Sequence, residues 1–289
     1  MKNQIKTILL LGILSSLLVG AGAAIGPAYA YGALALALVL NVGAYFYSDR
    51  IVLAMSHARE VSPMEAPELY GVVEELAARA QIPTPRVFII DDAQPNAFAT
   101  GRNPKVGVVA VTTGILRVLS LRELRGVLAH EIAHIKNRDI LVASVAAVIA
   151  SAISWLGQAL SFAAFAGRGD DEEGASPLGG LLFAILAPIA AVLIQMGISR
   201  SREYLADEAG ARLSGDPEAL ARALEKLEVG AHAIQGEAHP ATASLYIVNP
   251  LAGARGVMEL FSTHPLTEER VRRLRSLGTR PSRSVAVFA

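Results

Sequence analysis

Long apolar runs alternate with polar stretches along the chain, and the first apolar run is the longest. No charged residue occurs at positions 7–48, a stretch of 42 residues. That length accommodates two helical membrane spans of about 20 residues each, with the Gly-Pro pair at 26–27 as the turn between them. The basic residues before this run and the Ala-Tyr-Ala triplet at 28–30 also match a cleavable signal peptide. Two spans are favoured because the apolar core approaches span length and a second apolar run follows directly.

Two further apolar runs lie at 140–165 and 177–198, and Pro188 predicts a kink in the second of them. A short acidic segment at 167–174 separates the two runs. An alternative is that both runs form a buried helical hairpin of a soluble domain. Buried core helices are usually shorter than the thickness of a bilayer, so the length of these runs favours membrane spans.

Basic residues flank the predicted spans on one side only, opposite the acidic segment and the uncharged turn at 26–30. These residues are Lys2, Lys6, Arg50, Arg59, Lys136, Arg138, Arg200 and Arg202. Positively charged loops favour the cytoplasmic side, which places the N-terminus and both polar stretches in the cytoplasm. The predicted organisation is therefore two spans at 1–48, a first soluble part at 49–139, a membrane hairpin at 140–198 and a second soluble part at 199–289.

The polar stretches predict a mainly helical domain with a small sheet. An amphipathic helix is expected at 63–80, and its pattern is broken by the prolines at 83–85. Extended segments are expected at 86–91, 95–101 and 105–112. Further helices are expected at 121–139, 201–214, 217–229, 253–261 and 267–277. The fold class is thus α+β, mainly α, in a multi-span membrane protein.

Composition narrows the classes of protein and of site that fit. A mean hydropathy of +0.43, with 53% hydrophobic and only 6% aromatic residues, exceeds what soluble globular domains usually carry. The chain has no cysteine, which excludes disulfides and cysteine-based metal sites. Its formal net charge is zero, so it has no cationic excess for binding nucleic acid. Any metal must therefore be held by histidine and carboxylate side chains.

The clearest chemical motif is His130-Glu-Ile-Ala-His134, within the helix predicted at 121–139. Residues four apart on an α-helix differ by about 40° around its axis, so both imidazoles point toward one place. Glu131 lies about 100° further round, where it can contact a water on a metal held by the two rings. The pattern is a zincin signature and predicts a metalloprotease. An accidental histidine pair on an amphipathic helix is the alternative, so a third ligand is required.

A carboxylate third ligand is available near the start of the helix predicted at 201–214. Glu203 and Asp207 are four apart and share a face of that helix. This spacing suits one metal ligand and one carboxylate that orients a ligating imidazole. Glu208 is a competing ligand, and a solvated surface charge is the alternative interpretation for both Asp207 and Glu208.

The order of these motifs resembles the HtpX family of membrane-bound zinc metallopeptidases. The shared motifs are His130-Glu-Ile-Ala-His134 followed by Ile-Lys-Asn-Arg-Asp139, then Arg202-Glu-Tyr-Leu-Ala-Asp207, then Ser262-Thr-His264-Pro265. The resemblance covers nearly the whole chain, including the two leading spans, the Pro-Asn-Ala-Phe-Ala stretch at 95–99 and the segment at 241–250. Several separate motifs in the right order make it specific.

The resemblance implies a zincin-like catalytic domain that binds one Zn²⁺ per chain through His130, His134 and Glu203. It implies that Glu131 is the general base that activates a zinc-bound water. It also implies that Asp207 supports the ring of His130. Three protein ligands would leave an open position on the metal for that water, which agrees with these roles.

Four other histidines and one tyrosine are further candidates for a role in catalysis. His264 is the best candidate, because in the wider family the corresponding His-Pro lies beside the active site; stabilising the oxyanion and gating the zinc are both open roles. Tyr246 is a weaker candidate donor, and packing is its alternative. His239, which also precedes a proline, is expected in a loop without a role. His57 and His232 are expected on the surface.

The resemblance also implies a substrate-binding edge strand at Asn96, Ala97 and Phe98. In zincins such a strand pairs antiparallel with an extended substrate, and main-chain groups make the contacts. Main-chain recognition predicts a broad tolerance for substrate sequence. An ordinary edge or turn segment is the alternative, because the stretch is short.

The motif residues lie close to the predicted membrane spans. Only 135–139 separate His134 from the third run, and only 199–202 separate the fourth run from Glu203. At 1.5 Å per helical residue, the zinc site is expected within about 10 Å of the cytoplasmic membrane surface. Membrane proteins in the lipid bilayer are therefore the expected substrates. The resemblance adds an inner-membrane location, removal of misfolded or damaged membrane proteins under stress, and other membrane quality-control proteases as candidate partners.

Three rival classes were considered. A transporter or channel with a structural zinc is disfavoured, because the predicted spans hold no ionisable residue that would mark a permeation path. A catalytically silent membrane scaffold is an alternative that only an assay excludes. A prenyl-protein endopeptidase of the CAAX type is the alternative within the enzymes, although those proteins carry more spans around a large chamber.

Overall fold

The computed structural model describes residues 2–25, 27–149, 200–234, 236, 242–250 and 265–278. Most of the third apolar run, the acidic segment and the fourth apolar run lie outside the described residues. The helix predicted at 253–261 and the residues His239 and His264 also lie outside them. The division of the chain at 139 and 198 therefore stays a prediction.

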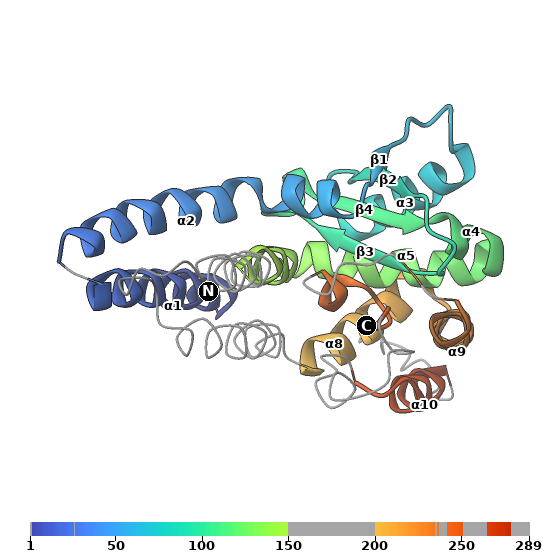
Figure 1. Ribbon diagram of the computed structural model, residues 1–289. Helices are drawn as coiled ribbons and strands as arrows, with labels where there is room; N and C mark the ends of the chain where they lie inside the picture. Colours follow the sequence, from blue (N-terminus) through green and yellow to red (C-terminus); the bar gives the residue numbers. More distant parts are fainter. Residues whose placement is uncertain are drawn as a thin grey trace, which may run out of the picture.

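Two long helices form an antiparallel hairpin that projects from the rest of the molecule. These are α1 (Lys2–Ile25) and α2 (Pro27–Met55), and the start of α1 and the end of α2 lie nearest the remaining elements (Figure 1). Among the described residues, α2 is the one helix that is long and apolar enough to cross a membrane, judged by length and composition. The Nδ2 atom of Asn41 donates to Oγ of Ser15 at 2.8 Å, which joins the two helices through polar side chains.

A small mixed sheet contains the predicted extended segments. Its strands are β1 (Arg59–Glu60), β2 (Arg86–Ile90), β3 (Ala97–Thr100) and β4 (Val108–Thr112), in the order β1-β2-β4-β3. β2 and β4 are parallel, whereas β1 and β3 pair antiparallel with their neighbours. β3 is thus an edge strand, and all of its residues are buried. A mainly helical fold with a small sheet is confirmed; the sequence did not predict β1, whose two residues are too few to give a pattern.

The motif helix is α5 (Leu121–Lys136), and its two ends are set by local chemistry. Glu123 and Ser120 form a capping box at its start, in which the Glu123 carboxylate accepts from Ser120 N at 2.9 Å. The helix ends at Lys136, and Arg138 adopts the left-handed conformation with φ of 59°. That turn redirects the chain before 139, so the helix is slightly shorter than the sequence predicted.

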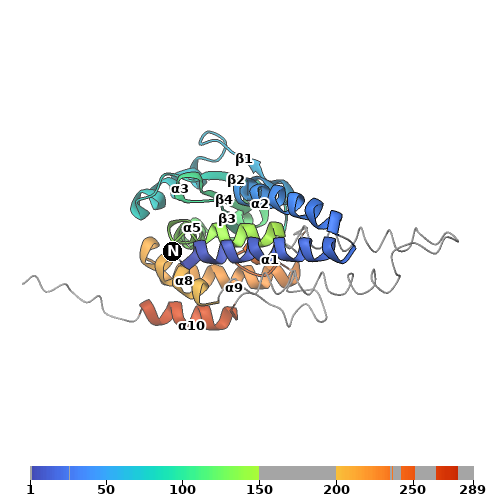
Figure 2. The same ribbon diagram turned by 90° about the vertical axis from the view of Figure 1, so that its left-hand side faces the viewer.

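α5 lies between the sheet and a layer of further helices (Figures 1 and 2). α3 (Pro67–Ala80) packs against α5, and the short α4 (Thr113–Val118) joins β4 to it. On the side away from the sheet, α8 (Arg200–Ser214) and α9 (Pro217–Ala233) pack on α5, and α10 (Thr267–Gly278) packs on both. These elements agree with the helices predicted at 63–80, 201–214, 217–229 and 267–277.

Two glycines allow the helices to approach α5 at backbone distance. A Cβ atom added at Gly210 of α8 would lie 2.8 Å from the backbone N of His130. A Cβ added at Gly126 of α5 would lie 2.9 Å from the backbone N of Leu220 in α9. Real Cβ atoms do not come this close to backbone, so only glycine fits at either position. The first contact sets the distance between the motif helix and the helix that carries Glu203.

The described start of the third apolar run is helical and packs with the N-terminal hairpin. In the segment Ile140–Ile149, Leu141, Val145 and Ile149 are buried against Ala44 of α2, with Leu11 of α1 beside them. The hydroxyl groups of Ser144 and Thr100 lie 2.7 Å apart and tie this segment to β3. The chain after the motif helix therefore runs directly into the group of helices formed by α1 and α2.

Candidate metal centre

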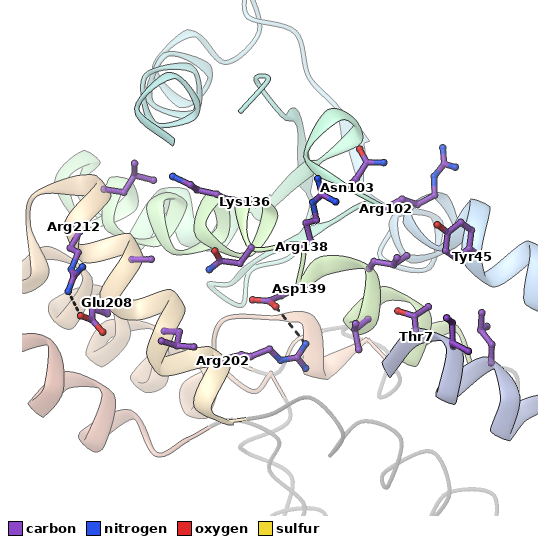
Figure 3. Close-up of a pocket in the computed structure, with 18 residues that line it drawn as sticks. Thr7, Tyr45, Arg102, Asn103, Lys136, Arg138, Asp139, Arg202, Glu208 and Arg212 are labelled. Carbon is purple, nitrogen blue, oxygen red and sulfur yellow. Dashed lines mark hydrogen bonds and ion pairs between the residues drawn. The ribbon is translucent and has the colours of Figure 1, made fainter. Parts of the chain in front are cut away.

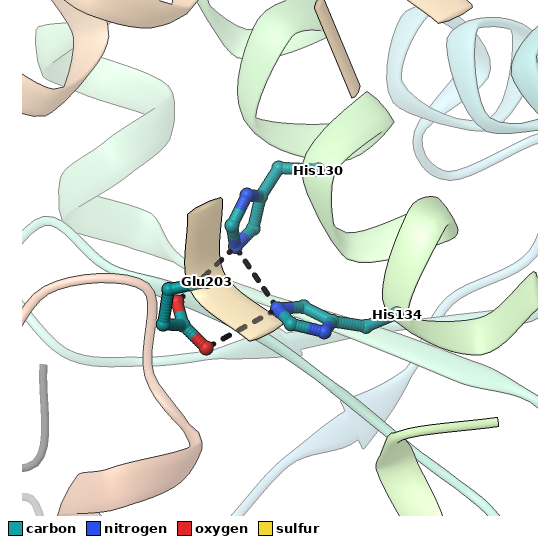
Figure 4. A group of neighbouring side chains, drawn as sticks. All are labelled: His130, His134 and Glu203. Carbon is teal, nitrogen blue, oxygen red and sulfur yellow. Dashed lines mark hydrogen bonds and ion pairs between the residues drawn. The ribbon is translucent and has the colours of Figure 1, made fainter. Parts of the chain in front are cut away.

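Three of the predicted metal-binding side chains converge on one point. His130 and His134 project from successive turns of α5, and Glu203 reaches them from the first turn of α8 (Figure 4). The Nε2 atoms of the two histidines are 3.1 Å apart. The carboxylate oxygens of Glu203 lie 3.6 Å from Nε2 of His130 and 3.5 Å from Nε2 of His134. The group was thus assembled from two distant parts of the sequence, as its spacing predicted.

These distances fit a tetrahedral metal. Zinc bonds to nitrogen and oxygen are about 2.0–2.2 Å long, which places neighbouring ligand atoms of a tetrahedral site roughly 3.3–3.6 Å apart. The ligand atoms of His130, His134 and Glu203 all lie within 4.8 Å of one another. Two imidazoles and a carboxylate without cysteine suit zinc as a borderline ion. The residues therefore fit a metal with three protein ligands and one open position.

A second carboxylate holds His130 from behind. The Oδ1 atom of Asp207 lies 2.9 Å from Nδ1 of His130, so the ring presents Nε2 to the other ligands. Burial disfavours the charged form of the imidazole, but Asp207 and Glu203 raise the pKa of His130 to about 9. Without a metal, the ring of His130 therefore readily carries a second proton, and metal binding at Nε2 must displace that proton. Asp207 thus lies beside His130, where the family resemblance implied it would be.

Arg270 of α10 fixes Asp207 in turn, and the sequence did not single it out. Its Nε and Nη2 atoms donate to the two oxygens of Asp207 at 2.8 and 2.7 Å. Its Nη1 atom donates to the carbonyl of Ile247 at 2.7 Å. Burial alone would raise the pKa of the Asp207 carboxyl, but Arg270 lowers it to about 2. A buried, charged pair therefore anchors the metal centre to the last helix of the described chain.

Glu131 lies beside the converging ligands and is 2% exposed. Within the described residues, its Oε1 atom has no hydrogen-bond partner. Burial raises the pKa of this carboxyl, although the nearby His130 and His134 lower it in part. Glu131 and His134 line a small cavity together with Glu203, Ala99 of β3 and Leu245. A buried carboxyl with a free oxygen beside the residues that would hold a metal could accept a proton from a water bound there.

Two charged residues near His134 also line this small cavity, and neither was identified as a site residue from the sequence. The Oδ2 atom of Asp139 lies 3.5 Å from Nδ1 of His134, just after the end of α5. Arg202 precedes Glu203 on α8 and lines the same cavity. Arg270, Asp139 and Arg202 carry common charged side chains in stretches rich in charge, so only their burial distinguishes them from surface residues.

The other candidates have mixed positions. Glu208, the competing ligand, pairs with Arg212 one turn along α8 and is not part of the converging group. His57 and His232 are exposed, and His264 lies outside the described residues. Tyr246 is buried with its ring edge-on to Phe98 at 5.0 Å, and burial raises its pKa to about 12.

The predicted substrate strand is an edge strand whose outer side is partly occupied. The carbonyl of Ala97 accepts from Ile247 N at 2.9 Å, and Phe98 forms an antiparallel bridge with Tyr246. The side chain of Asn96 donates to the carbonyl of Val248 at 2.8 Å. The segment at 242–250 therefore pairs with the first half of β3. Its role toward a substrate stays a prediction.

Comparisons with known proteins agree with this centre. The model of Peptidase family M48 matches residues 63–278. A protein named Protease HtpX homolog from Syntrophobacter fumaroxidans is 53% identical over 283 residues, which cover 96% of this chain and 100% of that protein. A protein of the same name from Methylibium petroleiphilum is 51% identical over 281 residues, which cover 96% of this chain and 98% of that protein.

A solved structure shares the fold at lower identity. The crystal structure of S. mikatae Ste24p is 22% identical with a TM-score of 0.51, and the match covers 94% of this chain and 66% of that one. At this identity the likeness concerns the fold alone. The family match and the relatives, together with the geometry of the His130, His134 and Glu203 group, lead to one conclusion. This chain belongs to Peptidase family M48 and, within it, to the HtpX-type membrane proteases, and it is a zinc metalloendopeptidase.

Proposed function

We propose that this endopeptidase hydrolyses peptide bonds of misfolded or damaged membrane proteins at the cytoplasmic surface of the inner membrane, with Glu131 as the general base and one zinc ion per chain. The observation that carries the catalytic part is the buried Glu131 carboxyl, whose Oε1 atom has no hydrogen-bond partner among the described residues. It lies in one cavity with His134 and Glu203. No other acidic side chain of the described residues lines that cavity except Asp139, which faces His134.

The side chains have distinct tasks in this proposal. Zinc, held by His130, His134 and Glu203, would polarise the scissile carbonyl and lower the pKa of the attacking water. Glu131 takes the proton from that water as it attacks and later delivers it to the leaving amine. The raised pKa of Glu131 brings the carboxyl closer to the pH at which it works, which favours both transfers. Asp207 and Arg270 keep the ring of His130 in one orientation.

Substrate pairing is proposed along the sheet edge formed by Asn96 and β3, which begins with Ala97 and Phe98. Neighbouring residues of a strand present their main-chain groups to opposite sides, so Ala99 faces the same edge as Ala97. Ala97 already accepts from Ile247, whereas Ala99 lines the cavity with Glu131. An extended substrate would therefore continue the pairing that the 242–250 segment begins, with Ala99 nearest the catalytic base. The proposed role of His264 beside this site lies outside the described residues.

The position of the centre supports membrane-protein substrates. His134 is followed within a few residues by the segment Ile140–Ile149, which packs between α1 and α2. α2 is apolar and long enough to span a bilayer. A cleavage site so near these helices favours segments that emerge from the same bilayer. The cytoplasmic orientation rests on the basic residues that flank the apolar runs, and an association with other quality-control proteases rests on family resemblance alone.

The first experiment compares zinc content and cleavage for the detergent-purified parent, Glu131→Gln and Glu203→Ala, with casein and a membrane protein as substrates. We expect Glu131→Gln to retain one zinc per chain and to lose cleavage by about 10²–10⁴-fold, the usual contribution of a general base. We expect Glu203→Ala to lose zinc as well. Cleavage at the parental rate by Glu131→Gln would refute the assignment of the base.

A second experiment tests the substrate class. A single-span substrate carries one cleavage sequence at increasing distances from the bilayer, on a rigid helical spacer of about 1.5 Å per residue. In proteoliposomes we expect cleavage close to the membrane and a steep fall beyond about 20 residues of spacer, roughly 30 Å. Equal cleavage at every spacer length would show that the bilayer does not position the substrate.

A further inference from the structure

A second, much larger cavity lies beside the metal centre. It is a partly open cleft of about 1310 Å³, lined by residues of α1, α2, the end of α5 and α8 (Figure 3). One wall is apolar and comes from Ile8 and Leu11 of α1 together with Leu141 and Val142. Most of the remaining lining, here called the polar wall, comes from the loops and helices of the catalytic part, and it also includes the apolar Leu205, Ala209 and Leu213 of α8. We refer to this whole cavity as the cationic cavity.

Positive charge predominates on the polar wall. Its cationic side chains are Arg102, Lys136, Arg138, Arg202 and Arg212. Only two carboxylates face them, Asp139 and Glu208, so cations exceed anions by three. Glu208 pairs with Arg212, and Asp139 also faces His134. The catalytic reaction uses none of the five cations, so the excess of charge is unexplained by the metal centre.

Arg202 is the unusual member of this group. It is 9% exposed, and none of its three guanidinium nitrogens has a hydrogen-bond partner within the described residues. The nearest carboxylate is Asp139, at 3.9 Å from Nη1, which is too far for a hydrogen bond. A buried cation without hydrogen bonds is strongly disfavoured, so such groups usually mark a ligand or ion. In Figure 3 this side chain extends into the cationic cavity toward Asp139.

The shape of a guanidinium group indicates the ligand. Its planar, forked N–H groups match the oxygens of phosphate and carboxylate, and its charge favours an anion. Phosphate supplies enough acceptors to engage Arg202 and a second cation at the same time. At the other end of the cavity, Arg102 lies over the ring of Phe46 in α2, 5.2 Å from its centroid, which places a further cation at the border of the apolar helices.

The apolar wall indicates where this phosphate comes from. Ile8 and Leu11 belong to α1, one of the proposed spans, and Leu141 and Val142 begin the next apolar run. Cations that meet apolar helices at this level lie where phospholipid headgroups are found, at the cytoplasmic surface. We propose that the cationic cavity binds an anionic phospholipid, with its phosphate on Arg202 and its acyl chains along α1. The level of the cavity in the bilayer rests on the membrane orientation given under Proposed function.

The binding test uses full-length protein in detergent, in the Glu131→Gln background so that cleavage plays no part. The probes are short-chain phosphatidylglycerol, the matching phosphatidylcholine, glycerol phosphate and inorganic phosphate, and native mass spectrometry measures binding. We expect phosphatidylglycerol to bind at least about tenfold more tightly than the other three, because it alone combines net charge with chains. Equal binding of phosphatidylcholine would overturn the proposal, and equal binding of inorganic phosphate would replace the lipid by a free anion.

Variants separate this site from general attraction to a charged surface. Arg202→Gln should weaken phosphatidylglycerol binding about tenfold, the effect of losing a charge-assisted pair. Because Arg202 adjoins Glu203, Arg102→Gln at the other end of the cavity provides a second variant with the same expected direction. Arg222→Gln removes an exposed cation of α9 as the matched control and should leave binding unchanged. If neither cavity variant weakens binding, or all three do so equally, the site is refuted.

An acidic peptide is the remaining competitor for the same cations. A short poly-glutamate peptide is added to the protein that holds phosphatidylglycerol, and it should not displace the lipid. Displacement at equal concentration would assign the cavity to the substrate chain instead. Since none of these measurements requires hydrolysis, cleavage at the parental rate by Glu131→Gln would refute the catalytic proposal and leave this one standing.

Discussion

The metal centre and the cationic cavity are neighbours that share Asp139 and Arg202, yet they treat buried charge in opposite ways. Behind the metal ligands, Arg270 makes three hydrogen bonds, to Asp207 and to the carbonyl of Ile247. In the cavity, Arg202 makes none within the described residues. A satisfied network fixes side chains before a ligand arrives, whereas an unsatisfied one depends on the ligand. The metal centre is therefore held rigid by its own hydrogen bonds, whereas the charge in the cationic cavity is left for a ligand to satisfy.

The largest effect is expected when Arg270, the cation that makes three hydrogen bonds behind the metal ligands, is removed. Arg270→Met leaves the buried Asp207 carboxylate without its partner, so we expect a loss of about 3–5 kcal/mol in the stability of the zinc-free protein. Arg272→Met on the same helix, where the exposed arginine pairs with Glu269, is the control. Thermal unfolding in detergent compares the two. Similar melting temperatures for both variants would mean that Arg270 does not anchor the centre.

A smaller loss is expected from widening the contact between α5 and α8. In Gly210→Ala, the new methyl group meets the backbone of His130 at 2.8 Å. We expect a destabilisation of about 1–3 kcal/mol, together with weaker zinc binding because Glu203 moves away. Gly71→Ala in α3 is the matched control, since its Cβ would meet nothing within 4 Å. That variant should be neutral or slightly stabilising. Equal behaviour of the two alanines in a zinc titration would argue against a distance set by Gly210.

Removing only the charge of Asp207 should weaken both metal binding and the fold. Asp207→Asn keeps the shape but replaces the charged acceptor that orients His130 by a neutral, weaker amide oxygen, so zinc affinity should fall about 10–100-fold. In the parent, the pKa of Asp207 is lowered from 3.8 to about 2, so its contribution to stability is present above pH 3.8 and is lost as pH falls toward 2. The stability gap between parent and variant should therefore narrow over that range. A competition assay with a zinc chelator and acid unfolding of the zinc-free proteins measure the two effects.

The smallest effect is expected in the cavity wall. Arg212 is exposed and pairs with Glu208 one helical turn away. Arg212→Ala should change stability by less than about 0.5 kcal/mol and leave zinc affinity unchanged. A loss comparable to that of Arg270→Met, measured in the same thermal assay, would erase the distinction between the two regions.

Helical spacing predicted which candidate ligands share a face, whereas the choice of Glu203 over Glu208 came from the family resemblance. His130 with His134, and Glu203 with Asp207, are both four apart, and the structure brings these two faces together. The main helices and three strands were predictable for the same reason, since periodicity is a local property. The order β1-β2-β4-β3 and the pairing of 242–250 with β3 were not, because they depend on contacts between distant segments.

The supporting residues could not be recognised in the same way. Arg270 stands in a helix with three other arginines, Arg272, Arg273 and Arg275. Its spacing from Leu274 and Leu277 places it on the apolar face of that helix, but its pairing with Asp207 depends on a contact between distant segments. Gly210 appears in the sequence as an ordinary helix-weakening residue, whereas its function is to let two backbones touch. In the sequence, Arg202 is a positive charge beside a predicted span and the first residue of a family motif, and neither feature indicates that its side chain is buried without a hydrogen bond to the described residues. The role of each of these residues depends on tertiary packing, which a local sequence pattern does not show.

The origin of Arg270 from the last described helix has a consequence for the newly synthesised chain. Arg270 lies 63 positions after its partner Asp207. At about 5–20 residues per second, a ribosome needs roughly 3–13 s to add those residues, after the two histidines and Glu203 have already been made. During that interval the apolar helices can enter the bilayer while the catalytic centre lacks its anchor. We expect nascent chains truncated before α10 to be inactive, so the order of translation itself delays proteolysis until membrane insertion is under way.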